Sequence, residues 1–277
     1  MSKHIFTEPR RKRTNQVLKQ PLPIGIYNSI AHLPLNEQSA YVGDLTEKGV
    51  VVVEDPHHRL MEFGFFGTSM INNSSRKNKR QSAEHDANLL HIQTVIPNFS
   101  SINKNENTSS DSNKEFTDRS KVFLNHYEAF FLCYAIGCLQ IKKFNGDWMK
   151  IEEVWNYFMS KCEDFSTKYC TYHHFRAKGW VVKNGLKFGA DFLLYKWGPP
   201  FFHASYSVLV LQDKNISWRE VAKLNRVSES VAKELIMVTV TRKKNIADQD
   251  LCDFSEYFSN VKVEEVLVKR WIPTQKR

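Results

Sequence analysis

The stretch that decides the fold runs from His174 to Tyr206 and reads HFRAKGWVVKNGLKFGADFLLYKWGPPFFHASY. A helix predicted over 165–178 ends here at Gly179, a residue type that commonly terminates helices. The pattern then changes to short apolar runs at 180–183 and 191–195, which predict strands, with the turn signal Asn184-Gly185 after the first. Gly198-Pro199-Pro200 forces a loop before the next apolar run, 204–211. Helices followed by strands predict an α+β domain.

The flanking sequence extends this pattern in both directions. Upstream, residues 151–159 predict a helix, and residues 124–140 are apolar on nearly every face, which predicts a buried helix. Downstream, Ser217 and Glu220 have the spacing of a capping box at a helix start. Residues 231–240 begin as a helix and become a β-branched strand, and 261–271 predict a final strand. We therefore expect a mixed sheet covered by helices.

A polar segment divides the chain. Of the 23 residues in 98–120, 13 are Asn, Ser or Thr, so this segment buries too little apolar surface to offset its ordering entropy. We predict a flexible linker at 98–120. It separates an N-terminal region, 1–97, that holds a small α+β domain from a larger C-terminal domain, 121–277.

The overall charge favours a polyanionic partner. The chain carries 39 basic and 30 acidic residues, a net charge of +9, and 24 basic and 17 acidic residues lie within 121–277. Nucleic acid or an acidic protein surface fits this excess. Five cysteines without regular spacing favour a reducing compartment over a disulfide framework. Residues 1–13 lack the apolar core of a secretory signal, and the longest strongly apolar run, 129–139, is too short to span a bilayer.

Several segments of the C-terminal half together resemble the catalytic domain of the tRNA-splicing endonuclease family. They are residues 174–183, 185–195, 198–206, 226–233 and 269–273, with a weaker echo at 64–67. The resemblance covers roughly residues 121–277 and is strongest to the eukaryotic catalytic subunit that cuts the 5′ splice site. It implies a C-terminal nuclease domain with a mixed sheet. It also implies RNA cleavage without a metal or other cofactor, leaving a 2′,3′-cyclic phosphate and a 5′-hydroxyl.

The resemblance places the catalytic residues of the family on Tyr195, His203 and Lys233. Attack of a 2′-hydroxyl on the neighbouring phosphate needs a proton acceptor, a proton donor and a cation near the phosphorane. A histidine, with a reference pKa near 6.5, suits proton donation at neutral pH, and a lysine supplies a compact cation. Tyrosine, with a reference pKa near 10, is the least obvious base. Tyr195 either acts as the base or orients the nucleophile.

The resemblance also implies partners and a second kind of site. The family holds a nucleotide at the cut between two flat side chains, which fall here on Arg226 and Trp271 and serve the other catalytic subunit's active site. We thus expect precursor tRNA as the substrate. We also expect a heterotetramer with a second catalytic subunit and two structural subunits, and the edge strand 261–271 as one pairing surface.

Other interpretations of these residues remain open. The chain is alternatively a non-catalytic structural subunit of the same complex, or a general RNA-binding module. Cys162, Cys170, His173 and His174 do not have the spacing of a standard zinc site, so no metal is expected. The run Arg10-Arg11-Lys12-Arg13 is either a nuclear-import signal or a solvated basic surface. With the family context it favours a nuclear location.

Overall fold

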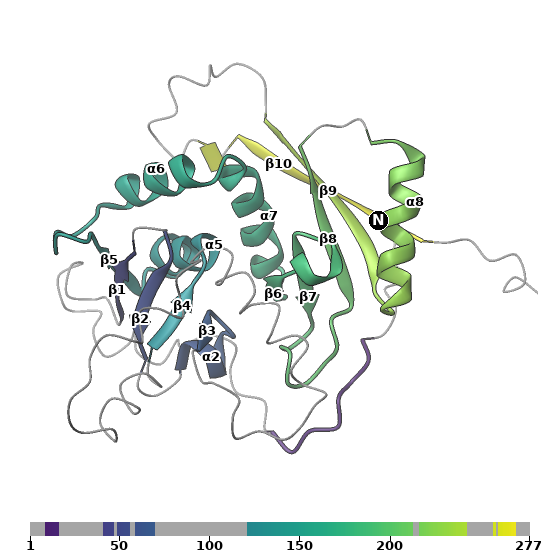
Figure 1. Ribbon diagram of the computed structural model, residues 1–277, viewed down its shortest axis with the longest axis horizontal. Coiled ribbons are helices and arrows are strands. Elements are labelled where there is room, and N and C mark those ends of the chain that lie inside the picture. The colour runs from purple at the N-terminus through teal and green to yellow at the C-terminus, as the bar shows by residue number, and fades with distance from the viewer. Residues whose placement is uncertain are drawn as a thin grey trace, which may run out of the picture. The chain divides into compact units, whose positions relative to one another are not determined.

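A computed structural model describes residues 9–16, 41–46, 49–55, 59–69, 121–212, 216–242, 257–258 and 260–269 (Figure 1). The chain divides into two compact units, one of residues 19–165 and one of residues 1–18 together with 166–277. Each unit has its own five-stranded sheet among the described residues. Helices combined with mixed sheets confirm the α+β class.

The unit formed by residues 19–165 is built on the sheet order β3-β4-β2-β1-β5. Its strands are β1 (Tyr41–Leu45), β2 (Val51–Glu54), β3 (Thr68–Ser69), β4 (Lys121–Leu124) and β5 (Leu139–Lys142). Its helices are α2 (Arg59–Phe63), α5 (His126–Phe130), the π-helical turn η3 (Phe131–Ile136) and α6 (Ile151–Lys161). The pair β1–β5 is parallel and the other pairs are antiparallel.

Strand pairing places residues 121–165 with the N-terminal strands, whereas the sequence analysis began the catalytic domain at 121. Val51 of β2 lies opposite Leu124, and Tyr41 of β1 lies opposite Leu139. The linker predicted at 98–120 lies outside the described residues. Pairing between residues so far apart in sequence leaves no local signal. Composition alone therefore did not reveal that β4 and β5 join the N-terminal strands.

The helix expected at 124–140 is confirmed over 126–136 and is shorter than expected at both ends. Asn125 caps α5 by accepting a hydrogen bond from the Glu128 N–H at 2.8 Å, so the helix begins one residue after β4 ends. Gly137, at φ 72°, then stops the helical turns in the left-handed conformation that glycine adopts easily. Leu124 before the helical turns belongs to β4, and Leu139 and Gln140 after them belong to β5.

The unit that contains residues 166–277 is built on the sheet order β10-β9-β8-β7-β6. Its strands are β6 (Val181–Asn184), β7 (Phe192–Tyr195), β8 (Tyr206–Leu211), β9 (Glu234–Arg242) and β10 (Val261–Val268). Its helices are α7 (Phe165–Ala177), the 3₁₀ turn η4 (Leu186–Phe188) and α8 (Trp218–Ser230). The sheet is mixed, because β8 and β9 are parallel and the other pairs are antiparallel.

Helix α8 makes the crossover that the parallel pair requires, and it lies beside β9 in Figure 1. Its predicted capping box is confirmed: Ser217 accepts from the Glu220 N–H and Glu220 accepts from the Ser217 N–H. The turn predicted at Asn184-Gly185 is not a two-residue hairpin. Gly185 has φ −101°, whereas a type I′ turn needs positive φ at both central residues, and η4 extends the connection to residue 191.

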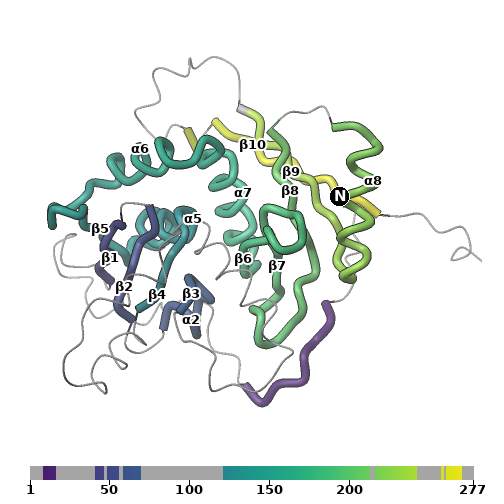
Figure 2. Tube along the Cα trace, viewed as in Figure 1, coloured from purple at the N-terminus to yellow at the C-terminus, as the bar shows by residue number. Residues whose placement is uncertain are grey.

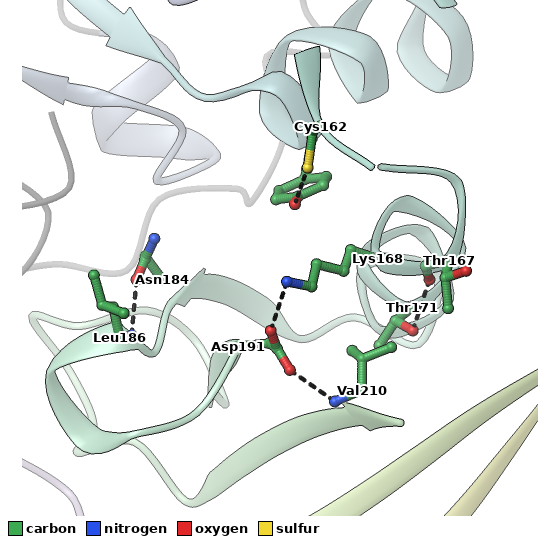
Figure 3. Close-up of polar contacts among 9 residues, drawn as sticks. Cys162, Thr167, Lys168, Thr171, Asn184, Leu186, Asp191 and Val210 are labelled. Carbon is green, nitrogen blue, oxygen red and sulfur yellow. Dashed lines mark hydrogen bonds and ion pairs between the residues drawn. The ribbon is translucent and has the colours of Figure 1, made fainter. Parts of the chain in front are cut away.

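Asp191 ties the helix α7 to the start of β7 and to β8. Its carboxylate accepts a hydrogen bond from the Val210 N–H at 2.8 Å and pairs with the Lys168 ammonium at 3.0 Å (Figure 3). The Asp191 N–H donates in turn to the Val208 carbonyl at 2.9 Å. These contacts fix where β7 begins, and therefore where it ends, at Tyr195.

Glu265 makes a second link, between α7 and the edge strand β10, which Figure 2 shows running along β9. The Glu265 carboxylate contacts both His174 and Lys178 of the helix end. The hydrogen bond from His174, followed by that from Lys178, lowers the pKa of Glu265 to about 2, against the opposing effect of partial burial. This carboxylate therefore stays ionised in the folded chain.

We predict that Glu265→Gln lowers the free energy of unfolding by about 1–2 kcal/mol at pH 7. Because the folded pKa lies below the unfolded value, near 4.3, the carboxylate stabilises the fold fully above about pH 4.5. That contribution is lost as the pH falls through the folded pKa, so the difference between variant and parent shrinks below pH 4. Urea unfolding of the parent and the variant at pH 7 and at pH 3 measures this difference in the free energy of unfolding.

The matched control is Glu264→Gln, one residue away. Glu264 is exposed and pairs with the exposed Lys262 at 2.7 Å, a kind of pair worth less than about 1 kcal/mol. Equal destabilisation by both variants, or a Glu265 effect that is as large at pH 3 as at pH 7, would contradict the assignment.

Candidate active site

The three candidate catalytic residues lie at the same end of three neighbouring strands. Tyr195 is the last residue of β7, and Leu194 before it lies opposite Tyr206, the first residue of β8. His203 precedes β8 in the loop from β7, and Tyr206 lies opposite Glu234, the first residue of β9. Lys233 immediately precedes Glu234. The sheet register thus brings Tyr195, His203 and Lys233 to the same end of the sheet, where β7 ends and β8 and β9 begin.

The loop 196–205 carries His203 in a fixed path. The Gly198 carbonyl accepts hydrogen bonds from the N–H groups of Phe201 at 3.1 Å and Phe202 at 3.2 Å, which closes a tight turn over the two prolines. Phe202 packs edge-on against Trp197 at 5.3 Å between ring centroids. Both phenylalanines are buried, while His203 beside them is exposed. The loop therefore presents the imidazole to solvent from a packed base.

Lys233 is held by backbone and aromatic contacts at the end of α8. Its N–H donates to the Ser228 carbonyl at 2.9 Å, and the next N–H, of Glu234, donates to the Ser205 carbonyl at 3.0 Å. The ammonium lies 4.3 Å from the centroid of the Phe188 ring and donates to the Val231 carbonyl at 3.3 Å. Only 9% of the residue is exposed. The ring face and the carbonyl oxygen are both favourable partners for a cation.

The residue before Lys233 has a strained backbone. Ala232 has φ 55°, in the left-handed region that costs a residue with a Cβ about 1–2 kcal/mol. The turn lets α8 end and β9 begin within three residues. It fixes the direction in which Lys233 leaves the backbone.

Tyr195 differs from His203 in its exposure. The tyrosine is 1% exposed, whereas the histidine is exposed at the loop surface. The neighbouring Tyr206 is also buried, and burial raises the pKa of Tyr206, with the negative charge of Glu234 adding to the effect. Tyr206 is thus held neutral and packs edge-on against Trp180 at 5.4 Å, which identifies it as part of the core.

Only one of the two residues expected to stack, Arg226, lies among the described residues. Arg226 is exposed on α8, where its side chain is accessible to another chain. Trp271 lies outside the described residues, as does the end of the predicted strand 261–271, since β10 ends at Val268. The proposed stacking pair stays a prediction.

Sequence reasoning missed two features beside the candidate catalytic residues. Phe188, under the Lys233 ammonium, lies in the turn Gly185–Gly189. The basic segment around Arg11 forms a β-bridge with Phe202 of the loop that carries His203. The glycines around Phe188 signalled a special turn, but no local pattern points from residue 11 to residue 202.

The side chains considered for zinc have other contacts. Cys162 lies 3.6 Å from the Tyr127 hydroxyl, His173 lies 3.2 Å from the Tyr169 hydroxyl, and His174 contacts Glu265. Within the described part of the chain, no three His, Cys, Asp or Glu residues form a group able to hold a metal ion. Across the same residues, no helix has the length and apolar character needed to cross a membrane.

Comparison with known proteins connects this arrangement to one family. The model of the tRNA intron endonuclease catalytic C-terminal domain matches residues 165–248, and that of the N-terminal domain of the same enzymes matches residues 42–155. These ranges agree with the two sheets, since the first holds β6 to β9 and the second holds β1 to β5.

Individual relatives carry the same name in animals, plants and fungi. The rat tRNA-splicing endonuclease subunit Sen2 is 42% identical over 159 residues, which are 54% of this chain and 34% of the rat protein. The Arabidopsis thaliana subunit Sen2-1 is 33% identical over 58% of this chain and 68% of its own length. The Saccharomyces cerevisiae subunit SEN2 is 32% identical over 218 residues, which are 74% of this chain and 54% of the yeast protein. This chain spans about a third of the length of its vertebrate relatives. This chain therefore belongs to the tRNA intron endonuclease family, as do the tRNA-splicing endonuclease subunits that it matches.

Proposed function

We propose that this chain is a catalytic subunit of a tRNA-splicing endonuclease and cleaves precursor tRNA at the 5′ splice site. The observation that supports it is the convergence of Tyr195, His203 and Lys233 on one end of β7, β8 and β9. A proton acceptor, a proton donor and a cation at one edge of a sheet are the groups that 2′-hydroxyl attack requires.

In the proposed reaction the 2′-oxygen attacks the neighbouring phosphorus as its proton leaves, with Tyr195 accepting that proton or orienting the hydroxyl. The bond from phosphorus to the 5′-oxygen breaks, and His203 donates a proton to the departing oxygen. Lys233 stabilises the charge that builds on the non-bridging oxygens. The products are a 2′,3′-cyclic phosphate and a 5′-hydroxyl. No metal or cofactor takes part in this proposal.

The relatives are named as subunits, and we extend that to this chain. We propose a heterotetramer with a second catalytic subunit and two structural subunits, located in the nucleus. Strand β10 is the outermost strand of its sheet among the described residues, so it offers backbone groups to a partner strand. A structural subunit or a simple RNA-binding module would also bind the substrate, but neither would generate cyclic phosphate ends.

The first test of this proposal concerns the three residues themselves. His203→Ala in a reconstituted complex should slow 5′ cleavage about 10²–10⁴-fold, the usual size of a positioned proton transfer. Lys233→Ala should act mainly on kcat, because the phosphorane gains charge that the ground state lacks. Tyr195→Phe removes only the hydroxyl from a buried ring and so separates chemistry from packing. Quantifying both cuts and the product ends on one precursor tRNA measures each effect.

The 3′ cut in the same reactions is the internal control, because the other catalytic subunit is expected to make it. Loss of the 3′ cut alone in His203→Ala would place this chain at the other splice site. Normal rates for both cuts would identify a structural subunit, and the absence of cyclic phosphate from the parent complex would leave only RNA binding.

The second prediction concerns metal ions. Because the proposed proton transfers and charge stabilisation all use side chains, cleavage should continue in EDTA when a polyamine keeps the RNA folded. Single-turnover rates with and without the chelator should agree within about twofold, a margin that corresponds to less than 1 kcal/mol of activation free energy. A chemical step that stops in EDTA and returns only with magnesium or zinc, at unchanged RNA structure, would contradict the mechanism.

The third prediction concerns the stacking pair. Arg226→Ala and Trp271→Ala should spare the 5′ cut and weaken the 3′ cut, because base stacking of about 1–3 kcal/mol is supplied across the assembly. Lys223→Ala, on the exposed surface of the same helix as Arg226, is the control for a change of charge. If both variants slowed the 5′ cut instead, the residues would serve their own active site.

A further inference from the structure

A basic segment near the start of the described chain is attached to the loop that carries His203. Arg11 forms an antiparallel bridge with Phe202. The His203 N–H donates to the Arg10 carbonyl at 3.0 Å, and the Lys12 N–H donates to the Phe201 carbonyl at 2.7 Å. Residues 10–12 thus lie antiparallel to residues 201–203, joined by one isolated β-bridge, and both segments belong to the same compact unit.

The register of this pairing places Arg10 directly opposite His203. In an antiparallel pair that aligns residue 11 with residue 202, residue 10 aligns with residue 203. Directly opposed side chains project from the same face with Cβ atoms about 4.5–5.5 Å apart. Arg10 and His203 are both exposed. The guanidinium of Arg10 therefore shares the open surface of the candidate general acid.

Three of the four basic side chains of this segment are exposed. Arg10, Arg11 and Arg13 are exposed, and across the described residues no carboxylate forms an ion pair with them. On the same loop, the Lys196 ammonium lies 5.5 Å from the Trp197 ring centroid and 5.8 Å from that of Phe202. Trp197 is 47% exposed. Cations interleaved with an accessible aromatic ring are typical of surfaces that bind single-stranded nucleic acid.

We propose that residues 10–13 form an RNA-binding segment of this active site, in which Arg10 contacts a phosphate next to the one that is cleaved. This inference rests on the proposed function, because it places the scissile phosphate at His203. Planar guanidinium groups bind phosphate through paired hydrogen bonds, and exposed ones bind it without first breaking an ion pair. The two backbone hydrogen bonds hold the segment in place before RNA binds, which reduces the entropic cost of binding.

The pairing also distinguishes this role from nuclear import. A receptor that takes an extended basic peptide would have to detach residues 10–12 from the loop and break both hydrogen bonds. RNA reaches the same side chains without disturbing them.

Two measurements on the reconstituted complex test the proposal. The first is the affinity for a precursor tRNA that carries a 2′-deoxy nucleotide at the 5′ cut, which binds without reacting. Arg10→Ala should weaken it about tenfold and reduce the slope of log K against log salt by about 0.7–1, the loss of one phosphate contact. The second is cleavage of the normal precursor, where KM for the 5′ cut should rise similarly while kcat changes little.

Matched variants separate this effect from general charge and from folding. Arg219→Ala removes the same group from the first turn of α8, at the end of the sheet away from His203, because α8 runs back from the end of β8 toward Lys233. It should leave affinity and salt slope unchanged. Arg10→Lys keeps the charge and should recover part of the affinity and the full slope.

The other possible outcomes contradict the proposal, and each points to a different explanation. If the parent complex cleaves but Arg10→Ala has the parent affinity, slope and KM, the inference fails and the proposed function stands. If such a variant also fails to enter nuclei, the segment is an import signal. If Arg219→Ala weakens RNA binding as much as Arg10→Ala does, binding depends on net charge alone and the proposal fails. A parent complex that cannot cleave would refute the proposed function instead.

Discussion

The parallel pairing of β8 with β9 is the constraint on which the candidate site depends. With Tyr206 opposite Glu234, the loop before β8 and the turn before β9 must open at the same end of the sheet. The antiparallel pairing of β7 brings Tyr195 to that end as well. A one-residue shift of either register would turn every side chain of the shifted strand to the other face of the sheet. Asp191, bonded to both α7 and β8, holds β7 against such a shift.

The left-handed turn at Ala232 shows what this arrangement costs. Helix α8 must stop and β9 must begin at once for Lys233 to lie at the sheet end, and the φ of 55° is the consequence. Strain of about 1–2 kcal/mol persists only where the surroundings impose it. Here the Lys233 N–H bonds back to Ser228 and the Glu234 N–H bonds across to Ser205, so both sides of the turn are fixed.

Local patterns predicted the parts of this structure that have local causes. The helix over 165–177, the capping box at Ser217 and the strands on either side of the proline loop follow from periodicity, caps and turn residues. The resemblance to a family then selected Tyr195, His203 and Lys233, which no periodicity distinguishes from ordinary surface or core residues. The differences have nonlocal causes: Leu124 lies in a strand because it pairs with Val51 of β2, and nothing near Arg11 indicates Phe202.

The last of those pairings has a consequence for RNA binding. The carbonyl that holds the backbone of His203 belongs to Arg10, the residue proposed to contact the RNA. The two backbone hydrogen bonds already hold this segment against the loop before RNA binds. Binding energy gained at the guanidinium therefore stabilises the bound substrate and the transition state equally, which raises affinity and leaves kcat unchanged. The chemical step is left to Tyr195, His203 and Lys233.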